Sequence, residues 1–177
     1  FRIYSQWGDD GIIQYLIYKL NIQNTQFIEF GVGNYFESTT HFLLVNNNWS
    51  GFIIDGSEQC MNIVKKSPFY WRYDLRPKTA FITKENINEL LKESNFHNLG
   101  LLHIDLDGND YWILEAIDMN KYNPDILILP ALAVTLINLR LPGIIAYSAT
   151  AFEFASPWPF KRVISHFVKS LPAFNLS

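Results

Sequence analysis

The sequence of 177 residues has a single cysteine, Cys60. One cysteine cannot form an internal disulfide, and no charged segment followed by an apolar one opens the chain, so we expect a cytoplasmic protein rather than a secreted one. An excess of one charge is also lacking, because 14 basic and 17 acidic residues give a net charge of −3. This balance excludes a strongly basic surface for nucleic acid or an anionic membrane, and it favours a small-molecule ligand.

The sequence also lacks an apolar run long enough to span a membrane. Its most apolar region, residues 126–154, is interrupted by prolines, an asparagine and charged residues: Pro130, Asn138, Arg140, Pro142 and Glu153. The longest uncharged run, residues 126–139, is shorter than the roughly 20 residues of a transmembrane helix. Internal repeats, low-complexity segments and linkers rich in proline, glycine or serine are absent too, so we expect a single domain over residues 1–177.

Instead, apolar segments with the character of strands alternate with helical patterns. We expect strands at residues 27–30, 51–55, 80–83, 99–105 and 124–129. We expect helices from a cap at Asp10 to residue 20, and at residues 38–45, 60–65, 84–95 and 109–117. Strands that are apolar throughout and alternate with helices indicate an α/β fold, a Rossmann-like doubly wound and mostly parallel sheet with helices on both faces.

Polar residues mark the ends of four of these strands. In a doubly wound sheet the ligand binds beyond the carboxyl ends of the strands. Those ends read "EFGVGN" (residues 29–34), "DGS" (residues 55–57), Thr83 and "DLDG" (residues 105–108). The sequence therefore predicts one crevice in which these groups converge.

Glu29 stands inside an apolar strand, where an unpaired carboxylate would cost several kcal/mol, so it must have a partner. A cationic ligand or backbone amides would serve, and the structural alternative is that Glu29 only holds the following turn. Gly31 and Gly33 follow directly, and glycines let the backbone approach a ligand closely. Their place between a strand and a helix favours a binding loop.

A dinucleotide fingerprint would need a third glycine at position 36, where this sequence has Phe36. This counts against NAD or FAD as cofactor. Asp55 ends the second expected strand, where a carboxylate can accept hydrogen bonds from both hydroxyls of an adenosine ribose. The alternative interpretation is that Asp55 caps the next helix.

The segments "FIEFGVGN" and "GFIIDGS" resemble the motifs of class I S-adenosylmethionine-dependent methyltransferases. The likeness is closer to FkbM-like methyltransferases and their relatives from bacterial polysaccharide gene clusters, because "SQWGDDGII", "NNNWSGFIIDGS" and "HIDLDGNDYWI" are also similar. It covers Tyr4 to about Leu129, with the motifs in the same order. It implies S-adenosyl-L-methionine as cofactor, with contacts at Gln6, Glu29, Gly31, Gly33, Asn34, Asp55, Gly56, Ser57 and Asp105.

The resemblance implies methyl transfer to a hydroxyl of a sugar or another small polar acceptor. A carboxylate at the end of the fourth strand could take the hydroxyl proton or hold a Mg²⁺ ion that acidifies it. The catalytic candidates are Asp105 and Asp107, and the metal candidates are Asp107 and Asn109, with Asp110 as a further ligand. An EF-hand calcium loop that starts at Asp105 is excluded. Such a loop needs glycine at its sixth position and glutamate at its twelfth, where this sequence has Asp110 and Ala116. The alternative is a turn over residues 107–110 that caps the next helix, and we expect one acid to cap and another to act.

Other interpretations stay open. His103 shares the strand parity of Asp105 and could act as a base, although a lone strand histidine is more often a satisfied core residue. The chain could instead be a nucleotide-dependent oxidoreductase, or an inactive binding or scaffold relative. The resemblance breaks after Leu129, so that residues 130–170 are divergent and a final strand pair is missing. The sheet edge that this would expose makes a homodimer a further expectation.

Overall fold

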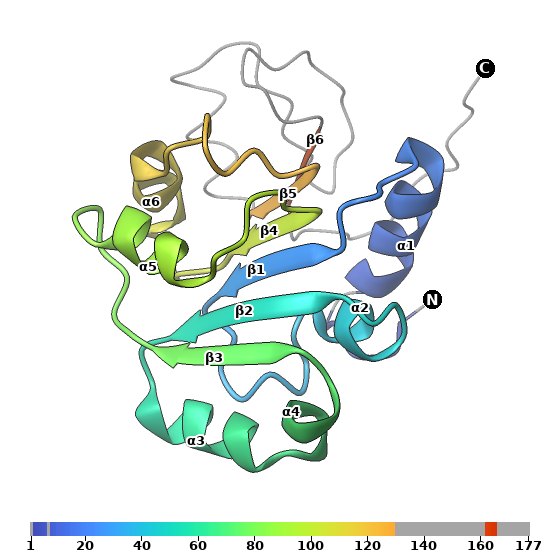
Figure 1. The fold of residues 1–177 in the computed structure, drawn as a ribbon, viewed down its shortest axis with the longest axis horizontal. Coiled ribbons are helices and arrows are strands. Elements are labelled where there is room, and N and C mark those ends of the chain that lie inside the picture. Colours follow the sequence, from blue (N-terminus) through green and yellow to red (C-terminus); the bar gives the residue numbers. More distant parts are fainter. Residues whose placement is uncertain (1, 7, 130–161, 166–177) are drawn as a thin grey trace.

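The computed structural model describes residues 2–6, 8–129 and 162–165, and Figure 1 shows their arrangement. One sheet contains six strands in the order β3-β2-β1-β4-β5-β6. The strands are β1 (Gln26–Phe30), β2 (Ser50–Asp55), β3 (Leu75–Thr79), β4 (Leu101–Ile104), β5 (Ile126–Leu129) and β6 (Arg162–Ser165). Every pair of neighbouring strands is parallel, so their carboxyl ends share one edge of the sheet.

Helices pack against both faces of this sheet. They are α1 (Asp9–Leu20), α2 (His41–Val45), α3 (Glu58–Lys66), α4 (Pro68–Arg72), α5 (Ile87–Glu93) and α6 (Asp110–Ala116). Successive strand residues point to opposite faces. Ile28 and Ile54 therefore join a core with α5 and α6, whereas Phe27 and Ile53 join a second core with α1 to α4. The predicted parallel sheet with helices on both faces is confirmed, and it is compatible with a Rossmann-like α/β fold.

The third strand differs from its prediction. The structure places β3 at Leu75–Thr79, and the apolar segment at residues 80–83 follows it without strand pairing. The strand lies at the end of the sheet and contains Arg76, Pro77 and Lys78, which are exposed or half-buried. An edge strand tolerates proline and charge, because one of its sides has no pairing partner. Apolar periodicity is therefore a poor guide to this strand.

The starts of three helices differ from their predictions. Gly8 rather than Asp10 is the N-cap of α1, so the prediction for Asp10 is wrong. The Asp10 carboxylate instead accepts hydrogen bonds from the amides of Ile3 and Tyr4 (2.7 and 2.8 Å) and Ser5 (3.2 Å). The helices expected at residues 38–45 and 84–95 are shorter, at 41–45 and 87–93.

The described residues do not include 130–161 and 166–177. Most of the predicted divergent segment, and the predicted absence of a final strand pair, therefore lie outside the described residues. The strand β6 lies within the predicted divergent segment and pairs with β5. Within the described ranges, no helix has the length and apolar character needed to cross a membrane.

Candidate functional site

The strand register arranges the candidate residues in two rows on one face of the sheet. Glu29 on β1 pairs in register with His103 on β4. Gly31 and Asp105 follow these residues by two positions, just beyond the carboxyl ends of β1 and β4, and the Asp105 carbonyl lies against Gly31. Asp55 ends β2 and lies in the same outer row, because β2 runs in register with β1. The candidate residues thus divide into a buried pair, Glu29 and His103, and an outer row that contains Asp55, Gly31 and Asp105.

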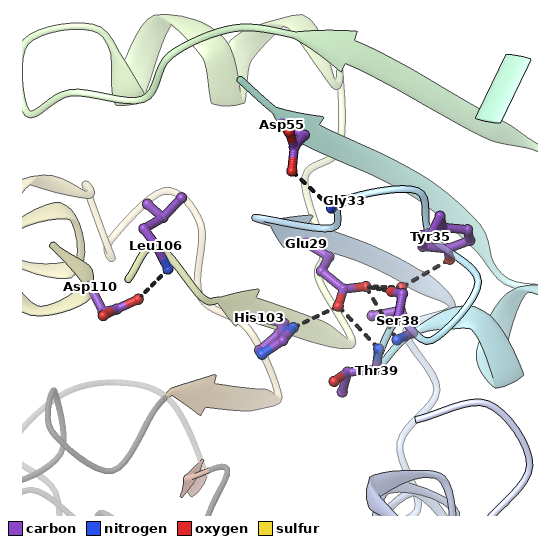
Figure 2. A network of polar contacts seen from close by, with 10 residues as sticks. Glu29, Gly33, Tyr35, Ser38, Thr39, Asp55, His103, Leu106 and Asp110 are labelled. Carbon is purple, nitrogen blue, oxygen red and sulfur yellow. Dashed lines mark hydrogen bonds and ion pairs between the residues drawn. The ribbon is translucent and has the colours of Figure 1, made fainter. Parts of the chain in front are cut away.

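Asp55 bridges two backbone amides at the carboxyl end of β2. Its Oδ2 accepts from the Gly33 N–H at 2.8 Å, as Figure 2 shows, and its Oδ1 accepts from the Ser57 N–H at 2.7 Å. Ser57 is the N-cap of α3, and its hydroxyl accepts from the Cys60 N–H. The alternative that Asp55 caps this helix is therefore wrong. Each Asp55 oxygen receives one of these two hydrogen bonds, and it can accept a second, since a carboxylate has about four acceptor positions.

The glycine loop has the conformation that its residues require. Gly31 and Gly33 have positive φ angles of 73° and 53°. A Cβ atom added to Gly33 would meet nothing within 4 Å, so the space beside this residue is open. The Asn34 side chain accepts from the Phe36 N–H within the loop. The position of a side chain at Gly33 is thus open, and the amide of the same residue donates to the Asp55 carboxylate.

Gln6 lies beside the same loop. Its side-chain amide donates to the carboxylate of Glu37 at 3.3 Å. The segment before α1 is held there by Asp10 and by Tyr4, whose ring stacks on His41 at a centroid distance of 4.1 Å. The structure therefore brings Gln6 to the loop that carries Gly33, and a cofactor contact of Gln6 stays a prediction.

Phe81 is a candidate that the sequence interpretation missed. It follows β3 and is 83% exposed. Its ring lies 3.3 Å from the position of a Cβ atom added to Gly56. Phe81 therefore borders the strand end that carries Asp55. The sequence predicts a strand at residues 80–83, so only the exposure of Phe81 reveals this position.

The Glu29 carboxylate is buried, with 2% of the residue exposed, and five donors of the chain surround it (Figure 2). His103 Nδ1 lies 2.7 Å from Oε1, and the amides of Thr39 and Thr40 donate at 3.2 Å. The hydroxyls of Ser38 and Thr40 donate to Oε2. A ligand could reach Glu29 only by displacing one of these donors, so the contacts favour the structural alternative for this residue.

These contacts set the ionisation of Glu29. Burial alone would raise its pKa, but attraction to His103 and hydrogen bonds from His103, Ser38 and Thr40 outweigh burial and lower it. Tyr35, whose hydroxyl is 2.9 Å from the Thr40 hydroxyl, has its pKa raised by burial and by the nearby Glu29 charge. Glu29 is therefore held as a carboxylate.

The turn after β4 is organised by Asp110. Its carboxylate accepts from the Leu106 N–H at 2.5 Å, drawn in Figure 2, and from the Gly108 N–H at 3.1 Å. Asn109 is the N-cap of α6 and makes no side-chain cap bond. Asp107 is exposed and has a positive φ of 50°. The acid that holds the turn is thus Asp110, whereas Asp105 and Asp107 stay candidates for catalysis.

The metal prediction is not decided by this geometry. Among the described residues, no group of three or more histidine, cysteine, aspartate or glutamate side chains gathers as a metal site. Mg²⁺ needs only one or two carboxylates besides water. Asp107 and Asn109 are exposed, and Asp110 is engaged by two amides. Residues 107 and 109 as Mg²⁺ ligands stay a prediction.

A hollow of about 570 Å³ lies elsewhere, lined by Glu58, Gln59, Asn62, Ile63 and Lys66. All five residues belong to α3, and the side chains of one helix cannot surround a ligand. The strand ends therefore offer the better candidate site, because functional groups from several elements meet there.

No model of a known protein family matches this chain, and a search of curated proteins found no match either.

Proposed function

We propose that the protein is an S-adenosylmethionine-dependent methyltransferase that acts on a hydroxyl of a sugar or a similar small polar acceptor. The observation that carries this proposal is the position of Asp55. Its carboxylate is oriented by the amides of Gly33 and Ser57 and can accept two more hydrogen bonds. A ribose presents two adjacent hydroxyls, and this arrangement is suited to receive both.

The residues around Asp55 support the same ligand. The open space beside Gly33 would admit it, and Gln6, Asn34 and Gly56 lie on the elements that border this space. Phe81 offers an exposed ring for stacking on the base. S-adenosylmethionine supplies a methyl group that is activated by its bond to a sulfonium.

The acceptor side is assigned to the end of β4. A hydroxyl must lose its proton when it attacks a methyl group, and Asp105 or Asp107 can take that proton or hold a Mg²⁺ ion that acidifies the hydroxyl. Asp105 is half-buried next to Gly31, whereas Asp107 is exposed. Asp107 is therefore the residue that an acceptor can reach most easily.

The test is transfer of a labelled methyl group from S-adenosylmethionine to a panel of sugars, sugar nucleotides and small polar alcohols, with and without Mg²⁺. Transfer to one acceptor supports the proposal, and Asp107→Asn should lower turnover while leaving cofactor binding unchanged. Asp118→Asn is the control, because Asp118 is also exposed but lies between α6 and β5. A titration with NADH separates the oxidoreductase alternative, and cofactor binding without turnover on any acceptor favours a scaffold.

A further inference from the structure

We infer that His103 is a positioning residue that acts through Glu29 to hold residues 31–40, the loop between β1 and α2, in its ligand-binding conformation. The inference builds on the proposed function, since it concerns the loop that would contact the cofactor. It assigns a role to His103. It also means that Glu29 supports ligand binding by holding the loop, and not by contacting the ligand itself.

The first step is that Glu29 joins both ends of the loop. Glu29 belongs to β1, one residue before the strand ends, whereas Ser38, Thr39 and Thr40 lie at the far end of the loop. Four of the five donors to the carboxylate come from this second group. The loop that contains Gly31 and Gly33 is thus closed through one buried side chain.

The second step is that His103 orients this side chain. The ring nitrogen Nδ1 lies 2.7 Å from Glu29 Oε1, and both residues are at most 3% exposed. The other four donors come from the loop itself, so His103 is the donor that a different strand provides. It therefore ties the loop to β4, the strand that precedes Asp105.

The third step is that other contacts of the loop are connected to Thr40. Its first residue donates to the Ile54 carbonyl at 3.0 Å, and Gly33 donates to Asp55. Tyr35 packs inside, with its ring near His41 and its hydroxyl near Thr40. Because Thr40 binds both Tyr35 and Glu29, a shift of the carboxylate would pass directly into the loop.

Two substitutions at position 103 separate the hydrogen bond from the volume of the ring. His103→Phe keeps an aromatic ring but removes the donor, whereas His103→Asn keeps an N–H donor at a similar position. Asp125→Asn is the control for a change to a buried polar contact elsewhere in the sheet. Asp125 accepts from Asn24 at 2.8 Å immediately before β5, at the opposite end of the sheet.

Hydrogen exchange of the free protein tests the inference without any ligand. In His103→Phe the amides of Thr39 and Thr40 should exchange about tenfold faster or more, because a hydrogen bond to a charged group contributes at least that factor to local opening. In His103→Asn they should exchange as in the wild type. In Asp125→Asn, exchange at residues 31–40 relative to the rest of the sheet should not change.

Titration with S-adenosylhomocysteine supplies the second readout. His103→Phe should weaken binding about tenfold, and His103→Asn should restore it. Unchanged loop exchange and unchanged binding in a folded His103→Phe protein would overturn the inference. If the wild type does not bind S-adenosylhomocysteine, the proposed function fails, whereas the exchange data still decide whether His103 holds the loop.

Discussion

Gly31 and Asp105 lie so close together that a Cβ atom on Gly31 would be 1.7 Å from the Asp105 carbonyl oxygen. This contact joins the carboxyl ends of β1 and β4, the two strands that carry the buried pair of Glu29 and His103. The oxygen belongs to the backbone, and a Cβ atom is attached directly to the backbone, so a side-chain rotation could not relieve the clash. The candidate site is therefore built on direct contact between two neighbouring strand ends.

The two loop glycines should respond differently to alanine. Gly31→Ala adds a backbone clash to the cost of a positive φ, so it should lower the free energy of unfolding by about 3 kcal/mol or more. Gly33→Ala has the positive φ but no clash, and it should cost about 1 to 2 kcal/mol. Urea denaturation of both variants measures the difference. Equal losses would show that the contact between Gly31 and Asp105 is not as close as described.

Substitutions of the two aspartates in the turn after β4 should affect the stability of the protein differently. Asp110→Asn leaves one amide of Leu106 or Gly108 facing an NH₂ group, so it should cost about 1 to 2 kcal/mol. Asp107→Asn is a substitution at an exposed position whose positive φ asparagine tolerates, and it should change stability by less than about 0.5 kcal/mol. Thermal unfolding of the matched pair checks this. A larger loss of stability in Asp107→Asn than in Asp110→Asn would show that Asp110 is not the residue that holds the turn.

The protein should lose stability in acid, because the Glu29 carboxylate becomes protonated. Its pKa is lowered in the folded state, so the folded protein favours the carboxylate more than the unfolded chain does. The resulting stabilisation is complete above the ordinary carboxyl pKa of about 4.3 and is lost as the pH falls below it. Denaturation between about pH 6 and pH 3 should show a steeper decline for the wild type than for Glu29→Gln. Parallel curves would remove Glu29 from the acid response.

Phe81→Ala should weaken binding of S-adenosylhomocysteine about fivefold, because stacking of an aromatic ring contributes about 1 kcal/mol. Stability should hardly change, since the side chain is 83% exposed. Trp71→Ala is the matched control: Trp71 is 80% exposed but lies on α4, before the amino end of β3. If both variants bind alike, the ring of Phe81 does not contact the ligand.

The sequence predicts the parallel sheet because buried parallel strands are almost entirely apolar, and "FIEF", "GFII" and "LLHI" are apolar except at Glu29 and His103. It fails at β3, because an edge strand with Arg76, Pro77 and Lys78 lacks the apolar pattern. Apolar patterns report burial, and this strand is only partly buried.

The site shows a similar division. The placement of Asp55 at the end of β2, beside Gly33, follows from strand order and parity, and the structure brings them into contact. The pairing of Glu29 with His103 does not follow from a motif, because it depends on the register between β1 and β4. Phe81 was missed for the same reason as β3, since its role depends on where the edge strand ends.

The central claim is that Asp55 holds the ribose of an adenosine cofactor. Isothermal titration of the folded chain with S-adenosylhomocysteine tests it most directly, beside Asp55→Ala and the control Asp118→Ala. The Asp118 carboxylate accepts a hydrogen bond from the Asn120 N–H, two residues later, as the Asp55 carboxylate does from the Ser57 N–H. Asp118, however, lies between α6 and β5.

The wild type and Asp118→Ala should bind one equivalent with the same affinity. Asp55→Ala should bind about 10- to 150-fold more weakly, because hydrogen bonds to a charged group contribute roughly 1.5 to 3 kcal/mol. Absence of binding by the folded wild type, or equal affinity in Asp55→Ala, would contradict the account.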